Sequence, residues 1–320
     1  MLYTIIMKLI SIISCVVTVL VIGNMAQAKT DPLTGWSFYV DPNSNAKHQV
    51  RAWRETRPDD AKQLRKMARE PQGKWLGEWI NHPKTEVAAW RKAAKQVNEV
   101  PVFVLYYIPQ RDCGSYSSGG ASSETVYRDF VDKVVSGIGN NKSVVIVEPD
   151  SLGAVSCLTK QEKKHRYALI NYAVQALKTN AQTIVYIDAG NPNWVPKKTM
   201  AKRLNQAGIA SADGFALNVS NFYKTKRNKN YGAQLSALVN NKHFVIDTSR
   251  NGLGPTSDYA WCNPLGRALG RVPTTNVKNQ LVDALLWIKP PGESDGECNG
   301  GPAAGVWWAE YALGLAQLVL

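Results

Sequence analysis

A short apolar run that ends in two carboxylates stands near the middle of the chain: Ser143-Val144-Val145-Ile146-Val147-Glu148-Pro149-Asp150. Its four consecutive β-branched residues favour an extended strand, and the lack of polar residues among them predicts burial on both faces. Such a strand is typical of a parallel sheet covered by helices, where functional groups gather at the carboxyl ends of the strands. Glu148 and Asp150 are therefore candidate functional groups.

The same pattern recurs from about residue 101 onward: a short apolar run, a stretch rich in Gly, Ser, Asp and Asn, and then an amphipathic segment. Seven runs are predicted strands: Val102–Tyr107, Ser143–Val147, Thr183–Ile187, Gly214–Val219, His243–Ile246, Leu285–Lys289 and Val306–Trp308. This alternation predicts βα units and a parallel α/β sheet. A further run at Trp36–Val40 precedes the repeat, so we place it outside the main sheet.

One helix is predicted in detail after the run at 143–147. Thr159 and Glu162 form a capping box, and the apolar residues from Ile170 to Leu177 follow at helical spacing. Weaker patterns predict helices over Glu86–Val97, Tyr127–Val135, Lys198–Gln206 and Gln234–Val239. Residues 248–276 show little periodicity, and so long a loop in a compact domain is usually functional.

The composition fits one globular domain of catalytic size. The chain has 320 residues, of which 44% are hydrophobic and 20% charged, which excludes disordered, collagenous and coiled-coil proteins. The formal net charge is +13, but Lys and Arg are spread along the chain and no nucleic-acid recognition motif accompanies them. We interpret the densest run, from Lys224 to Lys229, as a solvated surface loop. A basic surface could alternatively favour adhesion to anionic material.

Residues 1–28 are a predicted signal peptide. They contain one charged side chain, Lys8, an apolar run from Leu9 to Ile22, and the small-x-small sequence Ala26-Gln27-Ala28. The run is short for a membrane span of about 20 residues, so a retained anchor is the weaker alternative. Cleavage after Ala28 would leave residues 29–320 as a single secreted catalytic domain, free of the membrane.

Secretion makes disulfides the expected state of the cysteines. Cys15 lies in the predicted signal peptide, and the four that remain are Cys113, Cys157, Cys262 and Cys298. Four cysteines allow three pairings, and their spacing does not choose among them. No two of these cysteines are close in sequence and the chain has only four histidines, so we expect no metal site of the Cys/His type.

Carboxylates follow nearly every predicted strand: Asp112, Glu148, Asp150, Asp188, Asp247, Glu293 and Asp295. Each alone is an ordinary turn or cap residue, but several on one rim are hard to keep ionised together without a cation. At least one should then have a raised pKa and act as a general acid, which hydrolysis of a glycosidic bond requires. Metal-dependent hydrolysis is the alternative explanation of such a cluster.

Signatures of other catalytic classes are absent. The sequence contains no G-x-S-x-G elbow, no phosphate-binding G-x-x-x-x-G-K-[ST] loop, no G-x-G-x-x-G after a strand and no H-E-x-x-H. Its ten Trp and thirteen Tyr suit platforms for sugar rings, because these side chains combine an apolar face with a polar handle. Trp194 and Trp261 are better cleft candidates than Trp287 and Trp307, which fall in predicted strands.

Two long motifs are the most specific features of the sequence. The first is Val104–Cys113 with its Gly/Ser-rich tail at 114–120, and the second is Val145–Leu152. They resemble the two signatures of glycoside hydrolase family 6, the inverting cellulases. Further similarity lies at Asp188–Gly190, Asn218–Phe222, Asp247–Gly252, Trp261–Pro264 and Trp287–Gly296. The resemblance spans essentially the whole mature chain.

The resemblance implies a distorted seven-stranded parallel α/β barrel, TIM-barrel-like but incompletely closed, with a cleft across the carboxyl ends of the strands. It also implies cleavage of β-1,4-glucan with inversion, without a metal or other cofactor. Asp150 would be the general acid, and Asp112 would help to keep it protonated. Asp295 would be the general base or an ionised stabiliser, while Ser118 and Tyr106 would position the catalytic water and distort the sugar ring.

The resemblance also implies substrate contacts and a disulfide pairing. Glucosyl hydroxyls would be bound by Asp188, Asn218, Lys289 and Glu293, and sugar faces by Trp194 and Trp261. The family pairs its cysteines in chain order, which gives Cys113 with Cys157 and Cys262 with Cys298. The chain departs from the family at Asn191-Pro192-Asn193, because a His commonly follows Asp188-Ala189-Gly190 there.

The compact length of the mature chain favours an open cleft, since family members that cut from chain ends roof the cleft with long loops. We therefore predict a monomeric endoglucanase whose partner is a polysaccharide, and no nucleic acid. An exo-acting cellobiohydrolase is the alternative within the family. A non-catalytic glucan-binding protein on the same scaffold is the alternative outside enzymes.

Overall fold

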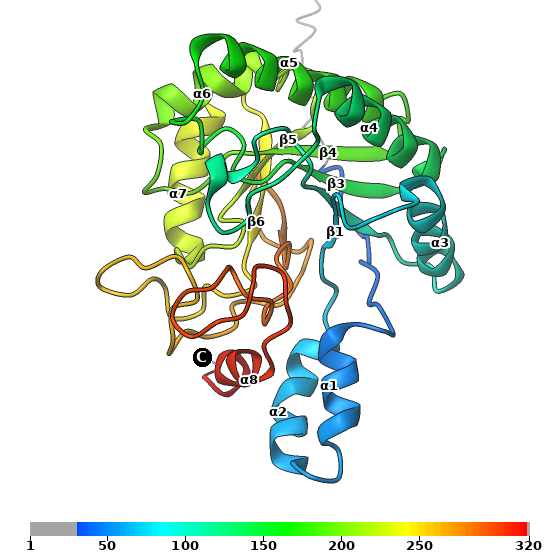
Figure 1. Ribbon diagram of the computed structural model, residues 1–320, viewed down its shortest axis with the longest axis vertical. Coiled ribbons are helices and arrows are strands. Elements are labelled where there is room, and N and C mark those ends of the chain that lie inside the picture. The colour runs from blue at the N-terminus through cyan, green and yellow to red at the C-terminus, as the bar shows by residue number, and fades with distance from the viewer. Residues whose placement is uncertain (1–30, 319–320) are drawn as a thin grey trace, which may run out of the picture. The chain divides into compact units, whose positions relative to one another are not determined.

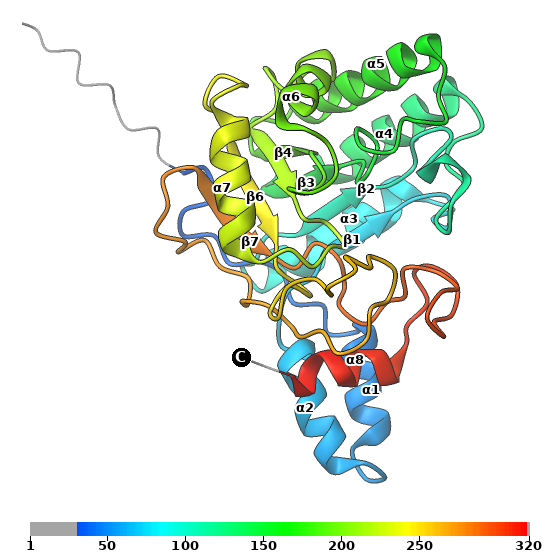
Figure 2. The same cartoon turned by 90° about the vertical axis from the view of Figure 1, so that its left-hand side faces the viewer.

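Seven parallel strands form one curled sheet in the computed structural model, which describes residues 31–318 (Figures 1 and 2). The predicted signal peptide and Cys15 lie outside the described residues. The strands are β1 (Lys74–Leu76), β2 (Val102–Leu105), β3 (Ser143–Val147), β4 (Thr183–Asp188), β5 (Gly214–Leu217), β6 (His243–Asp247) and β7 (Val282–Leu286). They are hydrogen-bonded in chain order, and within residues 31–318 no ladder joins β7 to β1. The predicted, incompletely closed seven-stranded barrel is confirmed.

The membership of the sheet differs from the prediction at both edges. Val306–Trp308 is no strand of this sheet, since Trp307 forms only an isolated bridge with Glu293. The seventh strand is instead β1, whose three residues are too few to show a sequence pattern. Strand β7 begins at Val282, three residues earlier than predicted, because the buried Asp283 interrupts its apolar pattern. Residues 36–40 lie outside the sheet, as predicted.

Helices cover the outer face of the curled sheet. They are α3 (Pro83–Gln96), α4 (Glu124–Ile138), α5 (Lys160–Leu177), α6 (Lys197–Gln206) and α7 (Thr225–Ser236). The side chains of β3 are fully buried and alternate between two apolar clusters, with Val145 and Val147 towards the helices and Val144 and Ile146 inside the barrel. Parallel strands packed on both sides in this way explain the uninterrupted apolar run.

Helix α5 forms as predicted. The Thr159 hydroxyl accepts a hydrogen bond from the Glu162 backbone N–H, the Glu162 carboxylate accepts one from the Thr159 N–H, and the predicted apolar face is buried.

Helix α7 differs from its prediction at Gln234–Val239, because it begins at Thr225 and ends at Ser236. The basic run from Lys224 therefore lies largely on a helix, and its interpretation as a loop is wrong. Few apolar residues mark α7 because it docks through small and polar residues, among them Gly232 against the Phe244 ring and the buried Asn228.

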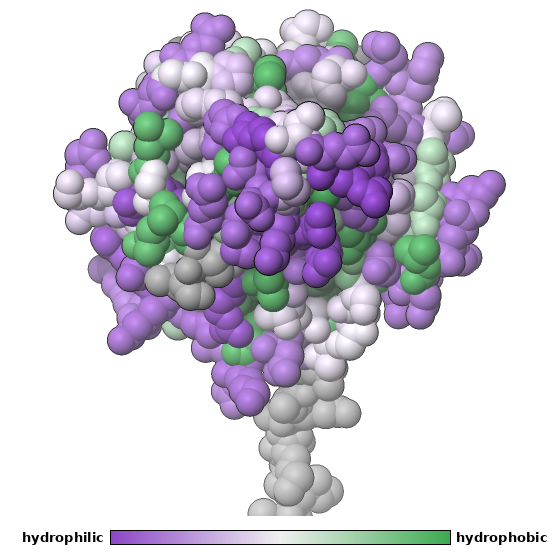
Figure 3. Space-filling model, turned by 90° about the horizontal axis from the view of Figure 1, so that it is seen from below, coloured by the Kyte–Doolittle hydropathy of each residue, from purple (hydrophilic) through white to green (hydrophobic). Residues whose placement is uncertain are grey.

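Three further helices pack together beside the open edge: α1 (Asn45–Trp53), α2 (Pro58–Ala68) and α8 (Ala309–Gln317). Arg57 donates to both carboxylate oxygens of Glu310, at 2.5 and 3.2 Å, and Lys66 donates to the Ala316 carbonyl at 3.1 Å. The face formed by these helices is mainly hydrophilic, with scattered single hydrophobic residues (Figure 3). None of the helices between residues 31 and 318 is both long and apolar enough to cross a membrane.

The predicted long loop is confirmed. Between β6 and β7, residues 248–276 contain no helix and no strand, apart from one isolated bridge at Thr274. The loop crosses the carboxyl end of the barrel and brings residues of its middle part, such as Tyr259 and Trp261, to the cleft.

Candidate active site

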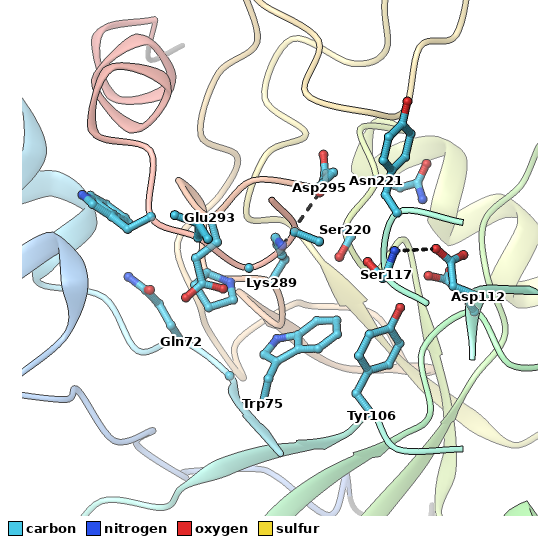
Figure 4. Close-up of a pocket in the computed structure, with 18 of the residues that line it drawn as sticks. Gln72, Trp75, Tyr106, Asp112, Ser117, Ser220, Asn221, Lys289, Glu293 and Asp295 are labelled. Atoms are coloured by element: carbon cyan, nitrogen blue, oxygen red, sulfur yellow. Dashed lines mark hydrogen bonds and ion pairs between the residues drawn. The ribbon is translucent and has the colours of Figure 1, made fainter. Parts of the chain in front are cut away.

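A cleft of about 1110 Å³ lies over the carboxyl ends of the strands (Figure 4). Its wall contains nine of the eleven residues that the sequence nominated for catalysis or substrate binding: Tyr106, Asp112, Ser118, Asp150, Trp194, Trp261, Lys289, Glu293 and Asp295. The other two, Asp188 and Asn218, are fully buried beneath the wall. Residues separated by up to 189 positions, from Tyr106 to Asp295, thus meet in one place.

Asp150 follows β3 at a turn in which its backbone has φ = +68°, a left-handed conformation that redirects the chain and presents the carboxyl group to the cleft. The preceding Glu148 is fully buried and accepts hydrogen bonds from the Tyr107 and Ile108 N–H groups, which ties the turn to β2. Asp150 keeps only part of its surface in the cleft. Burial and then the negative charges of its carboxylate neighbours, Asp188 first among them, raise the pKa of Asp150 well above its usual value.

Asp188 does not contact the cleft, which corrects its assignment to sugar binding. Its Oδ2 accepts the Asp150 N–H at 3.0 Å and the Gly190 N–H at 3.1 Å. Its Oδ1 has no hydrogen-bond partner among the described residues, and burial raises its pKa to about 7. Asp188 therefore supports the turn of Asp150 from below and adds a nearby acidic group to it.

Asn218 likewise supports the wall instead of forming it. Its Nδ2 donates to the Asp247 carbonyl at 2.9 Å and to the Asn221 carbonyl at 3.2 Å, and its Oδ1 accepts from the Tyr223 N–H. These bonds shape the loop that carries Ser220 and Asn221 into the cleft. A direct sugar contact by Asn218 is not supported, because the residue has no exposed surface.

Asp112 lies on a tight loop across the cleft from Lys289 (Figure 4). Its Oδ2 accepts the Ser117 N–H at 2.9 Å. Burial raises the pKa of Asp112, while the Ser117 N–H and the Arg111 charge oppose that rise. Ser117 also interacts with the Tyr106 hydroxyl. It thus links Asp112 and Tyr106, two predicted catalytic residues, although the sequence did not single out Ser117.

Arg111 organises the loop that carries Asp112 and Ser118. Its buried guanidinium pairs with Glu78 at 2.6 and 2.8 Å and donates to the carbonyls of Ser117, Ser118 and Tyr106. Ser118 itself is exposed at the rim, and the Tyr106 ring packs edge-on against Trp75 with centroids 4.9 Å apart.

Asp295 is held by a fully buried arginine to which the sequence pattern assigned no role. Arg250 donates to both carboxylate oxygens of Asp295, at 2.8 and 3.0 Å, and the Asn263 N–H donates to Oδ2 at 3.0 Å. The Lys289 ammonium lies 3.8 Å from Oδ1. Such a carboxylate is fixed in position, and its negative charge is matched by two cations.

Lys289 and Glu293 extend this charged wall. Burial lowers the pKa of Lys289, although the negative charge of Asp295 opposes the shift. Burial raises the pKa of Glu293, and the charges of Lys289 and Lys74 oppose that rise. Both side chains face the cleft beside Trp75 and Gln72 (Figure 4).

Aromatic rings form platforms along the cleft. Trp194 lies over Gly153 and Gly190, where any Cβ would meet its ring at 2.6 and 3.1 Å, and it is 41% exposed. Trp261 is 48% exposed, and the centroid of its ring lies 6.0 Å from that of the Tyr116 ring. Trp307, which the sequence ranked below Trp194 and Trp261 as a cleft candidate, also lines the cleft, whereas Trp287 is buried.

Other cleft aromatics had no distinguishing signal in the sequence: Trp75, Trp79, Trp90, Tyr116, Tyr223 and Tyr259. Trp75 lies within β1, and a position within a predicted strand had counted against Trp287 and Trp307 as cleft residues.

The disulfides Cys113–Cys157 and Cys262–Cys298 confirm the predicted pairing, with Cα atoms 5.6 and 6.2 Å apart. The first joins the loops after Asp112 and Asp150, and the second joins the long loop to the segment of Asp295. In the chain-entropy picture each stabilises the fold by about 4 kcal/mol. Among residues 31–318, no group of three or more His, Cys, Asp or Glu side chains is placed to hold a metal ion.

Arg166 of α5 is a second tie between the loops of Asp112 and Asp150. It is buried and donates to the carbonyls of Pro109 and Gln110 at 2.8 Å and to that of Ala154 at 2.9 Å. It forms no ion pair with any acidic side chain in the described chain. Both loops are thus bonded to one rigid helix.

We expect Arg166→Met to lower the free energy of unfolding by about 3 kcal/mol, because several buried carbonyls lose their donors. Urea unfolding measures the change. Lys164→Met, at an exposed position of the same helix, is the control and should change the value by less than about 0.5 kcal/mol. Equal stability of the two variants would contradict the bracing role.

A parallel α/β barrel that gathers carboxylates and tryptophans in one cleft has the architecture of a glycoside hydrolase. Residues 33–318 match the family described as glycosyl hydrolases family 6, and the chain belongs to that family. The resemblance seen in the sequence is confirmed.

Individual relatives agree. Endoglucanase A of Cellulomonas fimi is 46% identical over 282 residues, which cover 88% of this chain and 61% of that protein, so the chain spans about three-fifths of that relative's length. Endoglucanase 1 of Streptomyces halstedii is 40% identical over 295 residues, which cover 88% of this chain and 89% of that protein. The solved structure of the endoglucanase Cel6 from Mycobacterium tuberculosis, in complex with methyl-cellobiosyl-4-deoxy-4-thio-β-D-cellobioside, superimposes with a TM-score of 0.85 at 46% identity, covering 90% of this chain and 98% of that one.

Proposed function

We propose that this protein is a secreted endo-β-1,4-glucanase that hydrolyses internal bonds of cellulose with inversion of configuration. The observation that carries the proposal is the pairing of two unlike carboxyl groups in one aromatic cleft. Asp150 has a strongly raised pKa, while Asp295 is bound by Arg250. Inverting hydrolysis needs one protonated and one ionised group in this way. The glucan analogue bound to the Mycobacterium tuberculosis relative supports the substrate class.

Asp150 acts as the general acid. A carboxyl group with a raised pKa keeps its proton to higher pH than an ordinary carboxyl group, so it can donate that proton to the glycosidic oxygen as the bond breaks. Loss of that proton turns Asp150 into an anion in a site that already holds Asp112 and Asp295. Because the negative charges of these carboxylates would repel that of Asp150, Asp150 retains its proton until the leaving group accepts it.

Asp295 acts as the ionised partner. Both of its oxygens accept from Arg250, and one also accepts from Asn263, which holds the carboxylate in a fixed position. This arrangement favours stabilisation of positive charge on the sugar, with the attacking water activated through a second water. Ser118, Ser117 and Tyr106 lie at the opposite wall, where they would position that water and the sugar ring.

Asp112 keeps Asp150 protonated by like-charge repulsion. We expect Asp112→Asn to move the alkaline limb of the kcat profile to lower pH, because removal of this negative charge lowers the pKa of Asp150. The rate falls as pH rises through that pKa, since only the protonated form donates. Asp129→Asn, an exposed position on α4, should leave the limb in place. If the alkaline limb of Asp112→Asn stays at the wild-type pH, Asp112 does not raise the pKa of Asp150.

The openness of the cleft supports internal cleavage. Five aromatic side chains along its wall are 41–53% exposed, so no loop within residues 31–318 roofs them: Trp79, Tyr116, Trp194, Tyr259 and Trp261. An endoglucanase rapidly lowers the viscosity of carboxymethyl-cellulose for each reducing end released. Slow thinning with cellobiose as the main product would instead indicate a cellobiohydrolase.

Inversion and secretion have their own tests. NMR of the fresh product should show the α-anomer first, and a β-anomer would contradict inversion. Secretion rests on the predicted signal peptide and on two disulfides, which form in oxidising compartments. Amino-terminal sequencing of the exported protein should begin at Lys29, whereas a start at Met1 would contradict cleavage.

A further inference from the structure

Helices α6 and α7 lie side by side on one flank of the barrel and carry charge of almost one sign (Figures 1 and 2). Residues 190–246 contain nine Lys and Arg: Lys197, Lys198, Lys202, Arg203, Lys224, Lys226, Arg227, Lys229 and Lys242. The same stretch contains one acidic residue, Asp213, whose carboxylate is already paired with Lys178 at 2.8 Å. This flank therefore carries a large excess of positive over negative charge.

Six of these side chains are exposed, and we call them the α6–α7 basic surface: Lys197, Lys198, Lys202, Lys224, Lys226 and Arg227. None of the six forms an ion pair within residues 31–318. Some basic residues elsewhere have acidic partners, as Arg57 has with Glu310 and Lys133 has with Asp129. The like charges of the α6–α7 basic surface repel one another, and binding of an anionic partner would relieve that repulsion.

The basic surface begins at the rim of the catalytic cleft. Arg227 donates to the Asn193 side chain at 3.1 Å and lies over the Tyr223 ring, and both of those residues line the cleft. Away from the rim, Lys198 and Lys202 flank a shallow hollow that also presents the amide side chains of Asn205 and Gln206. Ammonium groups beside amides suit a carboxylate next to hydroxyl groups, as in an acidic sugar.

We propose that the α6–α7 basic surface binds a polysaccharide of uronic acids, beside the cleft that takes the neutral glucan of the proposed function. A neutral glucan gains nothing from these charges. Single-stranded nucleic acid is disfavoured because neither helix exposes an aromatic ring for base stacking. An anionic membrane is disfavoured because, among residues 190–246, the exposed large apolar side chains are Leu238 and Trp194, and Trp194 belongs to the cleft wall.

Binding of the purified protein to immobilised polygalacturonate at low and at physiological salt tests the proposal. Lys198→Gln/Lys202→Gln/Lys226→Gln should bind about tenfold more weakly than the wild type at low salt, since each exposed ionic contact contributes up to about 1 kcal/mol. The control Lys84→Gln/Lys92→Gln/Lys95→Gln removes the same charge from exposed positions of α3, beyond the opposite edge of the sheet, and should stay within about twofold of the wild type. Added salt should weaken wild-type binding.

Equal weakening of both variants would overturn the proposal, because net charge alone would then explain binding. Tighter wild-type binding to duplex DNA or to phosphatidylserine vesicles than to polygalacturonate would overturn the choice of partner. All three proteins should hydrolyse neutral hydroxyethyl-cellulose at the same rate. A wild type without that activity would contradict the proposed hydrolase function, whereas the binding comparison would still decide the basic surface.

Discussion

Asp150→Asn is expected to lower kcat on unsubstituted cello-oligosaccharides by about 10³-fold or more, because the leaving oxygen loses its proton donor. The Asn amide fills about the same volume as the carboxyl group and can still form hydrogen bonds, but it has no acidic proton to transfer. The cleft should therefore keep its shape, and the KM should change little. An aryl cellobioside with a good leaving group needs little protonation, and its rate should fall much less. Steady-state kinetics on the two substrates measures the difference.

The matched control for this variant is Asp59→Asn, at an exposed position on α2 that is not part of the cleft wall. It should retain wild-type rates on both substrates. Equal losses of Asp150→Asn on both substrates would show that the side chain does not act by protonating the leaving group. Full activity of Asp150→Asn on cello-oligosaccharides would remove the proposed mechanism altogether.

Asp295→Asn should affect both stability and activity. It leaves the fully buried Arg250 without its carboxylate, and loss of one partner of a buried ion pair typically costs about 3 to 5 kcal/mol. Chemical denaturation should show this decrease in the free energy of unfolding. Activity should fall about 10²-fold or more in the remaining folded enzyme, since the negative charge opposite Asp150 is gone.

A second variant separates the two effects of this substitution. Asp295→Asn/Arg250→Met removes both charges, so it should regain part of the lost stability, because no unpaired charge stays buried, while activity remains low. Glu297→Gln, at an exposed position two residues downstream, should change stability by less than about 0.5 kcal/mol. If Asp295→Asn were as stable as this control, the ion pair would not be a major support of the cleft.

Local patterns in the sequence were enough for much of the fold. Strand β3 is an unbroken β-branched run and α5 carries its own capping box, so both could be predicted from neighbouring residues alone. Strand β1 could not, since three residues do not establish a period, and neither could α7, whose docking residues are small or polar. The disulfide pairing came from the family resemblance, because spacing left three possibilities open.

The chemistry of the site divides in the same way. Which residue types follow each strand is written in the chain, and so the carboxylates of Asp112, Asp150 and Asp295 could be nominated from their order. Their environments depend on groups far away in sequence, and only the curled sheet brings these together. It places Asp188 beneath the wall instead of in it, and it puts Arg250 against Asp295 across 45 positions. Burial and charge proximity set which carboxyl keeps its proton, and both are properties of packed space, which no local pattern encodes.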